Sequence, residues 1–393
     1  MDEVRNPFAP GAGSQPHELA GRQAIMDAAR ISIRRNIMGR HSKSQILLGL
    51  RGTGKTVLLN QIERMAEENS HLAAYIEASE EKPLPALLYP KIHQAIRRFS
   101  LVKNAREKTH AAFRALRAFA GAFKVTVGDL SISVDPAMGI ADSGDLEADL
   151  SDLFLRLGEA AHAAGGAWAL LIDEVQYLSN RDFSALIVAL HRVAQKNLPI
   201  IFFGAGLPQV AALSGDAKSY AERLFDFPPV GPLDEHAANE AIRQPISEEG
   251  EAISAEALRL IYMETQGYPY FLQEWGYQVW NIADVSPMGA DDVGQASSAA
   301  IRRLDDGFFR VRFDRLTPKE REYVFAMASL GKGPYRSADV AATLNEPINS
   351  LGPRRAAIIR KGMIYSPAHG DIAFTMPLFD RYLERIGSAD TGG

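Results

Sequence analysis

Apolar residues follow two different spacings along the first part of the chain. Short apolar runs, typical of buried strands, occur at 46–48, 71–78, 167–178 and 198–206. Between these runs the apolar residues recur every three or four positions, as they do in 146–157, which is the spacing of a helix packed on one face. Strands that alternate with helices are typical of a parallel sheet covered on both faces. The pattern therefore predicts a three-layer α/β core.

From Asp234 onward the pattern is helical, and it predicts about four helices. Breaks between them are expected at Pro245, at the turn Gly267-Tyr268-Pro269 and at Pro287. Such a region, placed after an α/β core, is expected to form a helical lid.

The last part of the chain has a third pattern. Helices are expected at 318–329, 337–344 and 348–361, followed by strands at 363–367 and 371–376 around a short turn. This order predicts a winged helix-turn-helix whose third helix is the recognition helix. The alternative is a winged helix that contacts protein rather than nucleic acid.

A chain of 393 residues exceeds what one hydrophobic core usually supports, so several domains are expected. The expected parts are an N-terminal arm (1–16), an α/β core (17–231), a helical lid (232–314), a winged-helix domain (315–387) and a disordered tail (388–393).

Composition narrows the possible chemistry. The chain has no cysteine, which excludes disulfides, cysteine-based zinc sites and thiol catalysis. A net charge of −5 indicates that any nucleic-acid surface is local. No stretch approaches the roughly 20 apolar residues of a spanning helix, and the polar N-terminus lacks the apolar core of a signal peptide. A cytoplasmic protein without a membrane partner is expected.

Residues 49–56 match the phosphate-binding P-loop pattern G-x-x-x-x-G-K-S/T, and they lie between a predicted strand and a predicted helix. Glycines allow the backbone to approach a phosphate closely, and the start of the helix favours an anion. Lys55 is expected to neutralise the β- and γ-phosphates of ATP, and the Thr56 hydroxyl to bind Mg²⁺. The residues expected to contact ATP here are Gly49, Leu50, Arg51, Gly52, Thr53, Gly54, Lys55, Thr56 and Val57.

The buried strand at 167–178 carries two adjacent carboxylates, Asp173 and Glu174. Carboxylates at the end of such a strand are costly unless a cation or a reaction uses them. Beside a P-loop, Asp173 is expected to bind Mg²⁺ and Glu174 to activate the attacking water, as in a Walker B motif. This strand is expected to lie next to the P-loop strand. The alternative is a strand that ends at a solvent-exposed acidic pair.

These motifs resemble those of AAA+ and STAND-type ATPases, and the order of the expected domains is similar to that of origin-recognition initiators. The resemblance implies a mostly parallel five-stranded sheet of order 5-1-4-3-2. It also implies that Gly21, Arg22 and Pro269 line the adenine pocket, although a Gly/Pro corner with an aromatic core explains Pro269 equally well. Arg223 stands where such ATPases place an arginine that reaches a neighbouring subunit's nucleotide; a surface arginine at a helix end is the alternative.

The sequence departs from that family at two positions. The strand 198–206 ends in Gly204-Ala205-Gly206, without the usual polar sensor residue, and Gln209 is the nearest polar candidate. The sensor arginine of the lid is also missing at the Pro269 turn. These departures favour a slow, STAND-like switch over a ring-shaped motor.

The expected function is an ATP-hydrolysing switch that couples its nucleotide state to double-stranded DNA. The predicted recognition helix carries four cations and no acid, which is the charge that DNA contact requires. The alternative is a signalling or defence ATPase that assembles with itself or with a protein partner. The residues assigned to DNA are Arg354, Arg355, Arg360 and Lys361.

Overall fold

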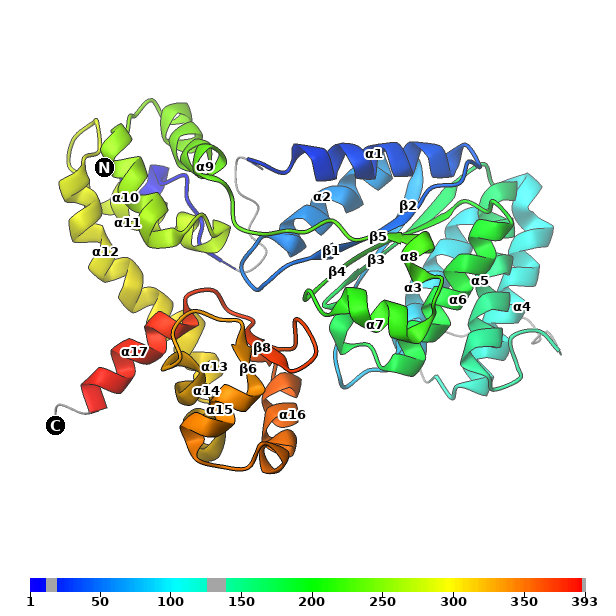
Figure 1. The fold of residues 1–393 in the computed structure, drawn as a ribbon. Helices are drawn as coiled ribbons and strands as arrows, with labels where there is room; N and C mark the ends of the chain where they lie inside the picture. The colour runs from blue at the N-terminus through cyan, green and yellow to red at the C-terminus, as the bar shows by residue number, and fades with distance from the viewer. Residues whose placement is uncertain (12–19, 126–138, 391–393) are drawn as a thin grey trace. The chain divides into compact units, whose positions relative to one another are not determined.

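The computed structural model describes residues 1–11, 20–125 and 139–390, and these form two compact units (Figure 1). The sheet unit comprises Ala24–Gly49 and Lys55–Pro229. The helical unit comprises Met1–Gln23, Leu50–Gly54 and Val230–Gly393. A hairpin expected at 124–134 falls almost wholly outside the described residues.

The sheet unit is built on five parallel strands. Their order is β2-β3-β4-β1-β5, which confirms the predicted order 5-1-4-3-2. One expectation is wrong: β3 does not adjoin the P-loop strand β1, because β4 lies between them. The strands are β1 (Ser44–Leu48), β2 (His71–Glu77), β3 (Ala167–Asp173), β4 (Ile200–Gly206) and β5 (Phe225–Asp226).

Helices cover both faces of this sheet, so the predicted three layers are present. In Figure 1, α1 and α2 lie over one face, and α3, α5 and α6 lie over the other. Residues 84–122 form two helices, separated by a short 3-10 turn at Lys103–Ala105. The helices are α1 (Gln23–Ile37), α2 (Lys55–Glu68), α3 (Leu84–Phe99), α4 (Arg106–Ala122), α5 (Leu146–Ala163), α6 (Asn180–Gln195), α7 (Val210–Ala217) and α8 (Ala221–Leu224).

The helical unit begins with the predicted lid helices. Pro245 does not break a helix as expected, but lies inside α9, three residues before its end. At that place a proline removes only one backbone hydrogen bond, and the Pro245 carbonyl still accepts from Glu249 N–H at 3.3 Å. The elements are α9 (Glu235–Glu248), α10 (Ala255–Thr265), α11 (Pro269–Ile282), α12 (Ala290–Leu304), a π-helical segment (Asp305–Arg310) and α13 (Val311–Phe313).

The N-terminal segment, expected as an extended arm, packs on α11. Phe8 is 3% exposed, and a Cβ at Gly276 would lie 2.6 Å from its ring. The indole N–H of Trp280 donates to the Asp2 carbonyl at 2.8 Å. The first described residues are therefore part of the helical unit.

The C-terminal segment has the element order predicted for a winged helix, with an additional strand. Its three-stranded antiparallel sheet has the order β6-β8-β7. The predicted recognition helix is shorter than expected, because 348–351 form a 3-10 turn ahead of α16. Part of the expected tail is helical as well. The elements are α14 (Pro318–Ala328), β6 (Tyr335–Arg336), α15 (Ser337–Leu344), α16 (Gly352–Arg360), β7 (Ile364–Tyr365), β8 (Asp371–Phe374) and α17 (Phe379–Asp390).

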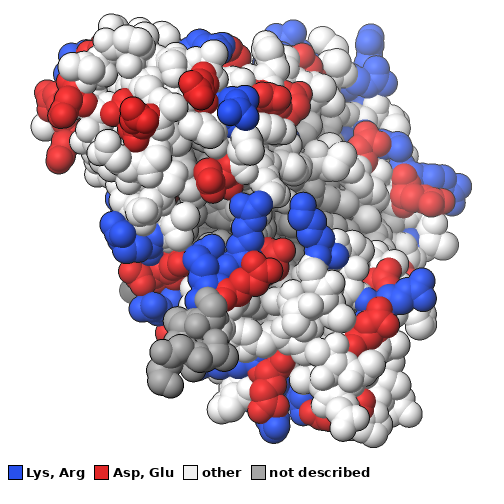
Figure 2. All heavy atoms as spheres, turned by 60° about the vertical axis from the view of Figure 1, so that its left-hand side comes forward, with Lys and Arg blue, Asp and Glu red and all other residues white. Residues whose placement is uncertain are grey.

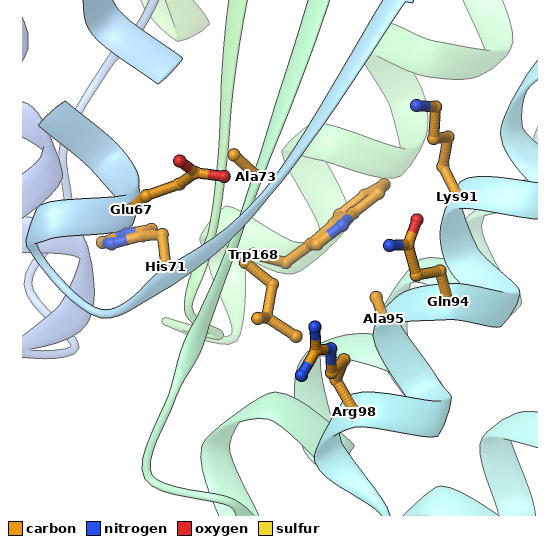
Figure 3. A pocket seen from close by; sticks show the side chains of 9 residues that line it. Glu67, His71, Ala73, Lys91, Gln94, Ala95, Arg98 and Trp168 are labelled. Carbon is orange, nitrogen blue, oxygen red and sulfur yellow. The ribbon is translucent and has the colours of Figure 1, made fainter. Parts of the chain in front are cut away.

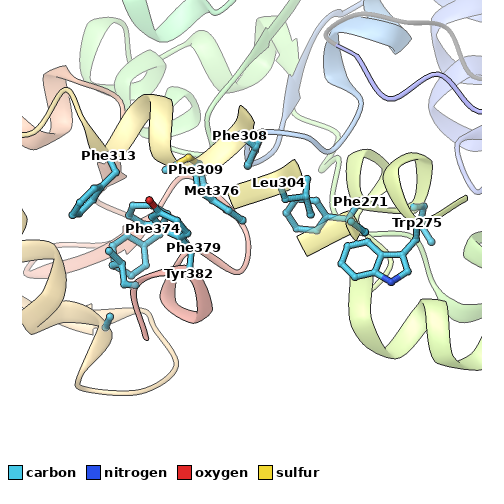
Figure 4. Close-up of a cluster of buried hydrophobic side chains, with 14 of the residues drawn as sticks. Phe271, Trp275, Leu304, Phe308, Phe309, Phe313, Phe374, Met376, Phe379 and Tyr382 are labelled. Carbon is cyan, nitrogen blue, oxygen red and sulfur yellow. The ribbon is translucent and has the colours of Figure 1, made fainter. Parts of the chain in front are cut away.

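One hydrophobic cluster joins the lid helices to the C-terminal segment (Figure 4). Phe308 packs edge-on against Phe271 of α11, with ring centres 5.8 Å apart. Its neighbour Phe309 stacks on Tyr382 of α17 at 5.2 Å. Because aromatic rings contribute large buried areas, the expected boundary at 314/315 does not separate two independent cores. Within the described part of the chain, no helix is long and apolar enough to cross a membrane.

Candidate nucleotide site

The P-loop has the strand–loop–helix context that the sequence predicts. β1 supplies a buried strand, Gly49 follows it, and α2 starts at Lys55, which is 8% exposed. Gly54 has a φ of +90°, in the left-handed region that favours glycine, and a Cβ built there meets no atom within 4 Å. The loop therefore keeps open space at the start of α2, where an anion is stabilised by helix amides.

The tip of the loop makes its contacts within the helical unit. Tyr270 N–H donates to the Gly52 carbonyl at 3.2 Å, and a Cβ on Gly52 would lie 3.1 Å from the Tyr270 Cβ. Arg51 N–H donates to the carbonyl of Thr375, which follows β8, at 2.9 Å. Backbone hydrogen bonds thus attach the tip both to the start of α11 and to the C-terminal segment.

Asp173 lies at the carboxyl end of β3 and is 4% exposed. Its Oδ2 accepts from the Thr56 hydroxyl at 2.6 Å and from the Tyr75 hydroxyl at 3.0 Å. Burial and the neighbouring Asp173 raise the pKa of Tyr75, so this phenol remains a donor at neutral pH. Thr56 and Asp173, expected to share one metal ion, are therefore adjacent.

These residues fit Mg²⁺ bound together with ATP. Mg²⁺ in such sites takes one or two protein oxygens and completes its shell with phosphates and waters. The Thr56 hydroxyl and the Asp173 carboxylate supply hard oxygen donors at the N-terminus of α2. The donor set therefore matches this metal.

Glu174 follows Asp173 in a left-handed conformation, with a φ of +54°. Its N–H donates to Asp173 Oδ1 at 2.8 Å, and its carboxylate accepts a hydrogen bond from the side-chain amide of Gln176. The Gln176 carbonyl oxygen accepts from Leu207 N–H at 3.1 Å. Gln176 therefore bridges the expected catalytic carboxylate and the residue that follows β4.

The glycines at the end of β4 have a packing reason. A Cβ on Gly204 would lie 3.1 Å from Val175 Cγ2, and one on Gly206 would lie 2.9 Å from Gln176 Oε1. The 3-10 turn Val175–Tyr177 therefore fills the space that a sensor side chain on β4 would need. Gln209, the candidate that the sequence suggested, lies at the start of α7 instead.

Sequence reasoning did not identify Tyr75 or Gln176 as part of this site. The available signal for Tyr75 was its position near the carboxyl end of a predicted strand, because parallel strands end at one edge of a sheet. Gln176 lies two positions after the acidic pair, but nothing in the sequence indicates which way the turn directs its side chain.

Comparison with known families decides the class of this protein. Residues 18–203 match the family model described as AAA ATPase domain. This region is an AAA ATPase domain. The chain is accordingly a P-loop ATPase with an AAA ATPase domain, and it uses a nucleotide. Residues 306–383 match a second family model, described as a domain of unknown function (DUF8462).

A solved structure with a similar fold spans nearly the whole chain. The Walker-type ATPase PABY2304 of Pyrococcus abyssi is 16% identical, with 94% of this chain and 97% of that chain covered and a TM-score of 0.55. The Aeropyrum pernix Orc1 protein in complex with DNA is 14% identical, with 98% and 97% covered and a TM-score of 0.47. The Thermotoga maritima RuvB Holliday junction branch migration motor is 14% identical, with 94% and 98% covered and a TM-score of 0.44. A comparison with curated proteins gives no significant match.

The residues expected to line an adenine pocket make packing contacts and hydrogen bonds within the helical unit of the ATPase. Arg22 is 9% exposed, donates to the carbonyls of Gly231 and Thr53, the latter at 3.4 Å, and has a pKa lowered by burial. Pro269 is the first residue of α11, after Gly267, where a Cβ would lie 2.1 Å from the Leu233 carbonyl oxygen. These contacts support the packed-corner interpretation of Pro269 and give Arg22 a role in holding the loop tip. Gly21 has a φ of +68° and packs on Ala237.

Arg223 lies in the last turn of α8, with an exposed side chain. An exposed cation at a helix end is stabilised by the helix dipole. This position is compatible with both interpretations of Arg223.

Three of the four cations assigned to DNA have partners inside the C-terminal segment. Arg354 makes two hydrogen bonds to the Glu346 carboxylate, each 3.1 Å long, and Arg355 donates to Ser337 Oγ at 3.0 Å. Lys361 contacts Glu320 at 2.6 Å. Arg360 has an exposed side chain. On the face shown in Figure 2, Lys and Arg side chains likewise lie next to Asp and Glu.

Proposed function

We propose that this ATPase is a molecular switch that hydrolyses ATP slowly and changes the state of its C-terminal segment as it does so. The observation that carries the proposal is the contact of 2.6 Å between Thr56 Oγ1 and Asp173 Oδ2, with Glu174 as the next residue. This contact supports a hydrolytic site at the carboxyl edge of the sheet.

Each residue has a separate role in the proposed reaction. The loop amides from Gly49 to Val57 and the Lys55 ammonium bind the phosphates of ATP. Thr56 and Asp173 hold Mg²⁺, which neutralises charge on the phosphate oxygens. Glu174 orients the attacking water and accepts its proton.

The slow turnover follows from the end of β4. Without a polar side chain on Gly204 or Gly206, no residue of this strand hydrogen-bonds the γ-phosphate. Gln176 instead orients the Glu174 carboxylate, which keeps acceptor sites free for the attacking water. We expect the missing γ-phosphate contact to limit the rate.

The loop tip can transmit a conformational change from the bound nucleotide to the C-terminal segment. Gly52 and Arg51 are bonded to Tyr270 and to Thr375 through their backbones. A change in loop conformation on phosphate binding alters these two hydrogen bonds, and the shared aromatic cluster links α11 to α17. ATP can shift the equilibrium between two conformations only by the difference in its binding free energy to them. A decisive switch needs a difference of several kcal/mol.

The partner that we propose for the C-terminal segment is double-stranded DNA. The element order of a winged helix and the exposed side chain of Arg360 support this assignment. Anisotropy of a labelled duplex at one fixed salt concentration, with and without ATP, tests it. Arg360→Glu is expected to weaken binding and to reduce the salt slope by about one, whereas Arg243→Glu on α9 serves as the control. Equal binding with and without ATP would contradict the coupling.

A second candidate partner is a protein, either another copy of this chain or a different one. The specific observation in its favour is that Arg354, Arg355 and Lys361 are already bonded within the segment. Nucleotide-dependent mass in solution separates the candidates: assembly with ATP that is lost in Arg223→Glu, without any DNA affinity, supports this second function.

A further inference from the structure

β2 is an edge strand of the sheet. It stands first in the strand order, and among the described residues it pairs with β3 alone, through seven consecutive residues. An exposed edge presents unpaired backbone groups that another chain can bind. The side of β2 that faces away from β3 is therefore a possible binding edge.

The direction of the free backbone groups follows from the register. Ala78 N–H donates to the Asp173 carbonyl at 3.0 Å. In a parallel ladder, alternate residues direct both N–H and C=O to the same neighbour. Residues 72, 74 and 76 therefore face β3, while Ala73 and Tyr75 direct their N–H and C=O groups toward the free edge.

A cavity of about 370 Å³ lies along this edge. Ala73 and Trp168 line it, with Lys91, Gln94 and Arg98 from α3 on one side and Glu67 from α2 on the other (Figure 3). The cavity thus joins a free strand edge to a row of polar side chains.

The row on α3 is cationic and too long for one small anion. Lys91 and Arg98 are seven positions apart, about 10 Å along a helix. Side chains on one face of an extended peptide repeat about every 7 Å, about 3 Å less than this separation, and the long side chains of Lys91 and Arg98 can bend to reach two such acidic residues. The opposite face of that peptide would meet Glu67, which disfavours acids there.

We infer that the free edge of β2 is a docking site for an extended acidic segment of a partner protein, which adds a strand to the sheet. Main-chain hydrogen bonds to Ala73 and Tyr75 supply affinity, and Lys91 and Arg98 supply selectivity for acidic side chains. The docking edge shares only Tyr75 with the nucleotide site, and it uses the Tyr75 backbone rather than the hydroxyl that contacts Asp173, so it does not depend on the proposed switch.

The test uses the full chain and two labelled peptides, one of alternating valine and glutamate and one of alternating valine and lysine. Anisotropy is expected to detect saturable binding of the acidic peptide, weakened by salt, and none of the basic peptide. Lys91→Glu with Arg98→Glu is expected to weaken binding at least about tenfold. Arg97→Glu, an exposed neighbour on α3 outside the cavity, is the matched control, and ATPase activity reports that each variant is folded.

A second measurement tests the strand pairing itself. Ala73→Pro removes an N–H directed to the free edge, which an edge strand tolerates, and it is expected to abolish binding. If that variant does not fold, acidic peptide with alternate backbone amides N-methylated replaces it and is expected not to bind the wild type. Binding of the methylated peptide, equal binding of both original peptides, or competition by inorganic phosphate at similar concentration would each overturn the proposal; the last result would indicate a small-anion site.

Discussion

The carboxyl edge of the sheet and the helix α16 both gather charged groups, but they use them differently. At the sheet edge Asp173 accepts from two hydroxyls and from the Glu174 N–H, and the Glu174 carboxylate accepts from the Gln176 amide, and these donors are neutral. On α16 and just after it, Arg354 and Lys361 are paired with carboxylates of the same segment. Neutral donors leave a negative charge available for a metal or a proton, whereas an ion pair neutralises its members.

This difference separates a site for chemistry from a site for stability. A carboxylate held by neutral donors can exchange them for Mg²⁺ or water. Lys361 and Glu320 stabilise the junction between α14 and the end of α16, because Glu320 also accepts from Thr317 N–H at 2.7 Å and is 5% exposed. The comparison predicts that substitutions at the sheet edge change turnover, while those on α16 change stability.

The largest effect is expected for Glu174→Gln. Loss of a general base lowers turnover by about 10²- to 10⁴-fold, while ATP binding remains, because the phosphate-binding residues are unchanged. Phosphate release and nucleotide affinity, measured side by side, check this. Glu77→Gln is the matched control: Glu77 is an exposed carboxylate at the end of β2, in register with Asp173. A turnover equal to that of the wild type in Glu174→Gln would remove Glu174 from the mechanism.

Lys361→Ala tests the other side of the comparison. This substitution leaves Glu320 without its cation, and we expect the free energy of unfolding to fall by about 2 kcal/mol. The loss is smaller than for a fully buried ion pair, because Lys361 is 31% exposed. Arg360→Ala, at an exposed position, should change stability by less than about 0.5 kcal/mol. Denaturant titrations of both variants measure the difference, and equal stabilities would contradict a structural role.

The same pair has a pH signature. Burial alone would raise the pKa of Glu320, but hydrogen bonds from Lys361 and Thr317 hold it below its usual value of 4.5. A carboxyl whose pKa is lowered by folding contributes stability above its unfolded pKa and loses it as the pH falls through the folded pKa. The difference in the free energy of unfolding between wild type and Lys361→Ala should therefore be largest at neutral pH and decrease below about pH 4.5.

The two regions also differ in how far their residues could be predicted. The P-loop motif determines the backbone from Gly49 to Thr56, and the end of a buried strand determines the place of Asp173, so these positions follow from short-range pattern. The partners of Arg354 and Lys361 lie 8 and 41 positions away. A long cationic side chain pairs with whichever acidic residue the fold brings near it. The sequence pattern does not show which acidic residue that is.

Gln176 shows the same limit at the sheet edge. The sequence shows that β4 ends in glycines, but only packing shows that Val175 and Gln176 need that space. Pro245 is a related case: a proline predicts a break, yet the helix α9 continues for three residues beyond it, because Pro245 lacks only its own N–H donor and its carbonyl still accepts from Glu249.

Gln176→Ala sharpens the role of neutral donors. If Gln176 positions the Glu174 carboxylate, turnover should fall about tenfold, equivalent to about 1.4 kcal/mol in the barrier, with unchanged ATP affinity. Gln209→Ala, at the start of α7, is the control. A change in thermal stability without a change in turnover would indicate a packing role only.

The smallest effect is expected for Tyr75→Phe, which removes one of the two hydroxyl donors to Asp173 and leaves the ring. A hydrogen bond to a carboxylate contributes about 1–2 kcal/mol, so the metal-free protein should lose about that much stability. Bound Mg²⁺ compensates the charge on Asp173, and the difference between wild type and variant should therefore narrow when Mg²⁺ and ATP are both present. Melting curves in chelator and in Mg²⁺·ATP measure both quantities, with Tyr177→Phe as a tyrosine control. An equal loss of stability in the two conditions would place Tyr75 outside the metal site and leave Thr56 as the only hydroxyl coupled to it.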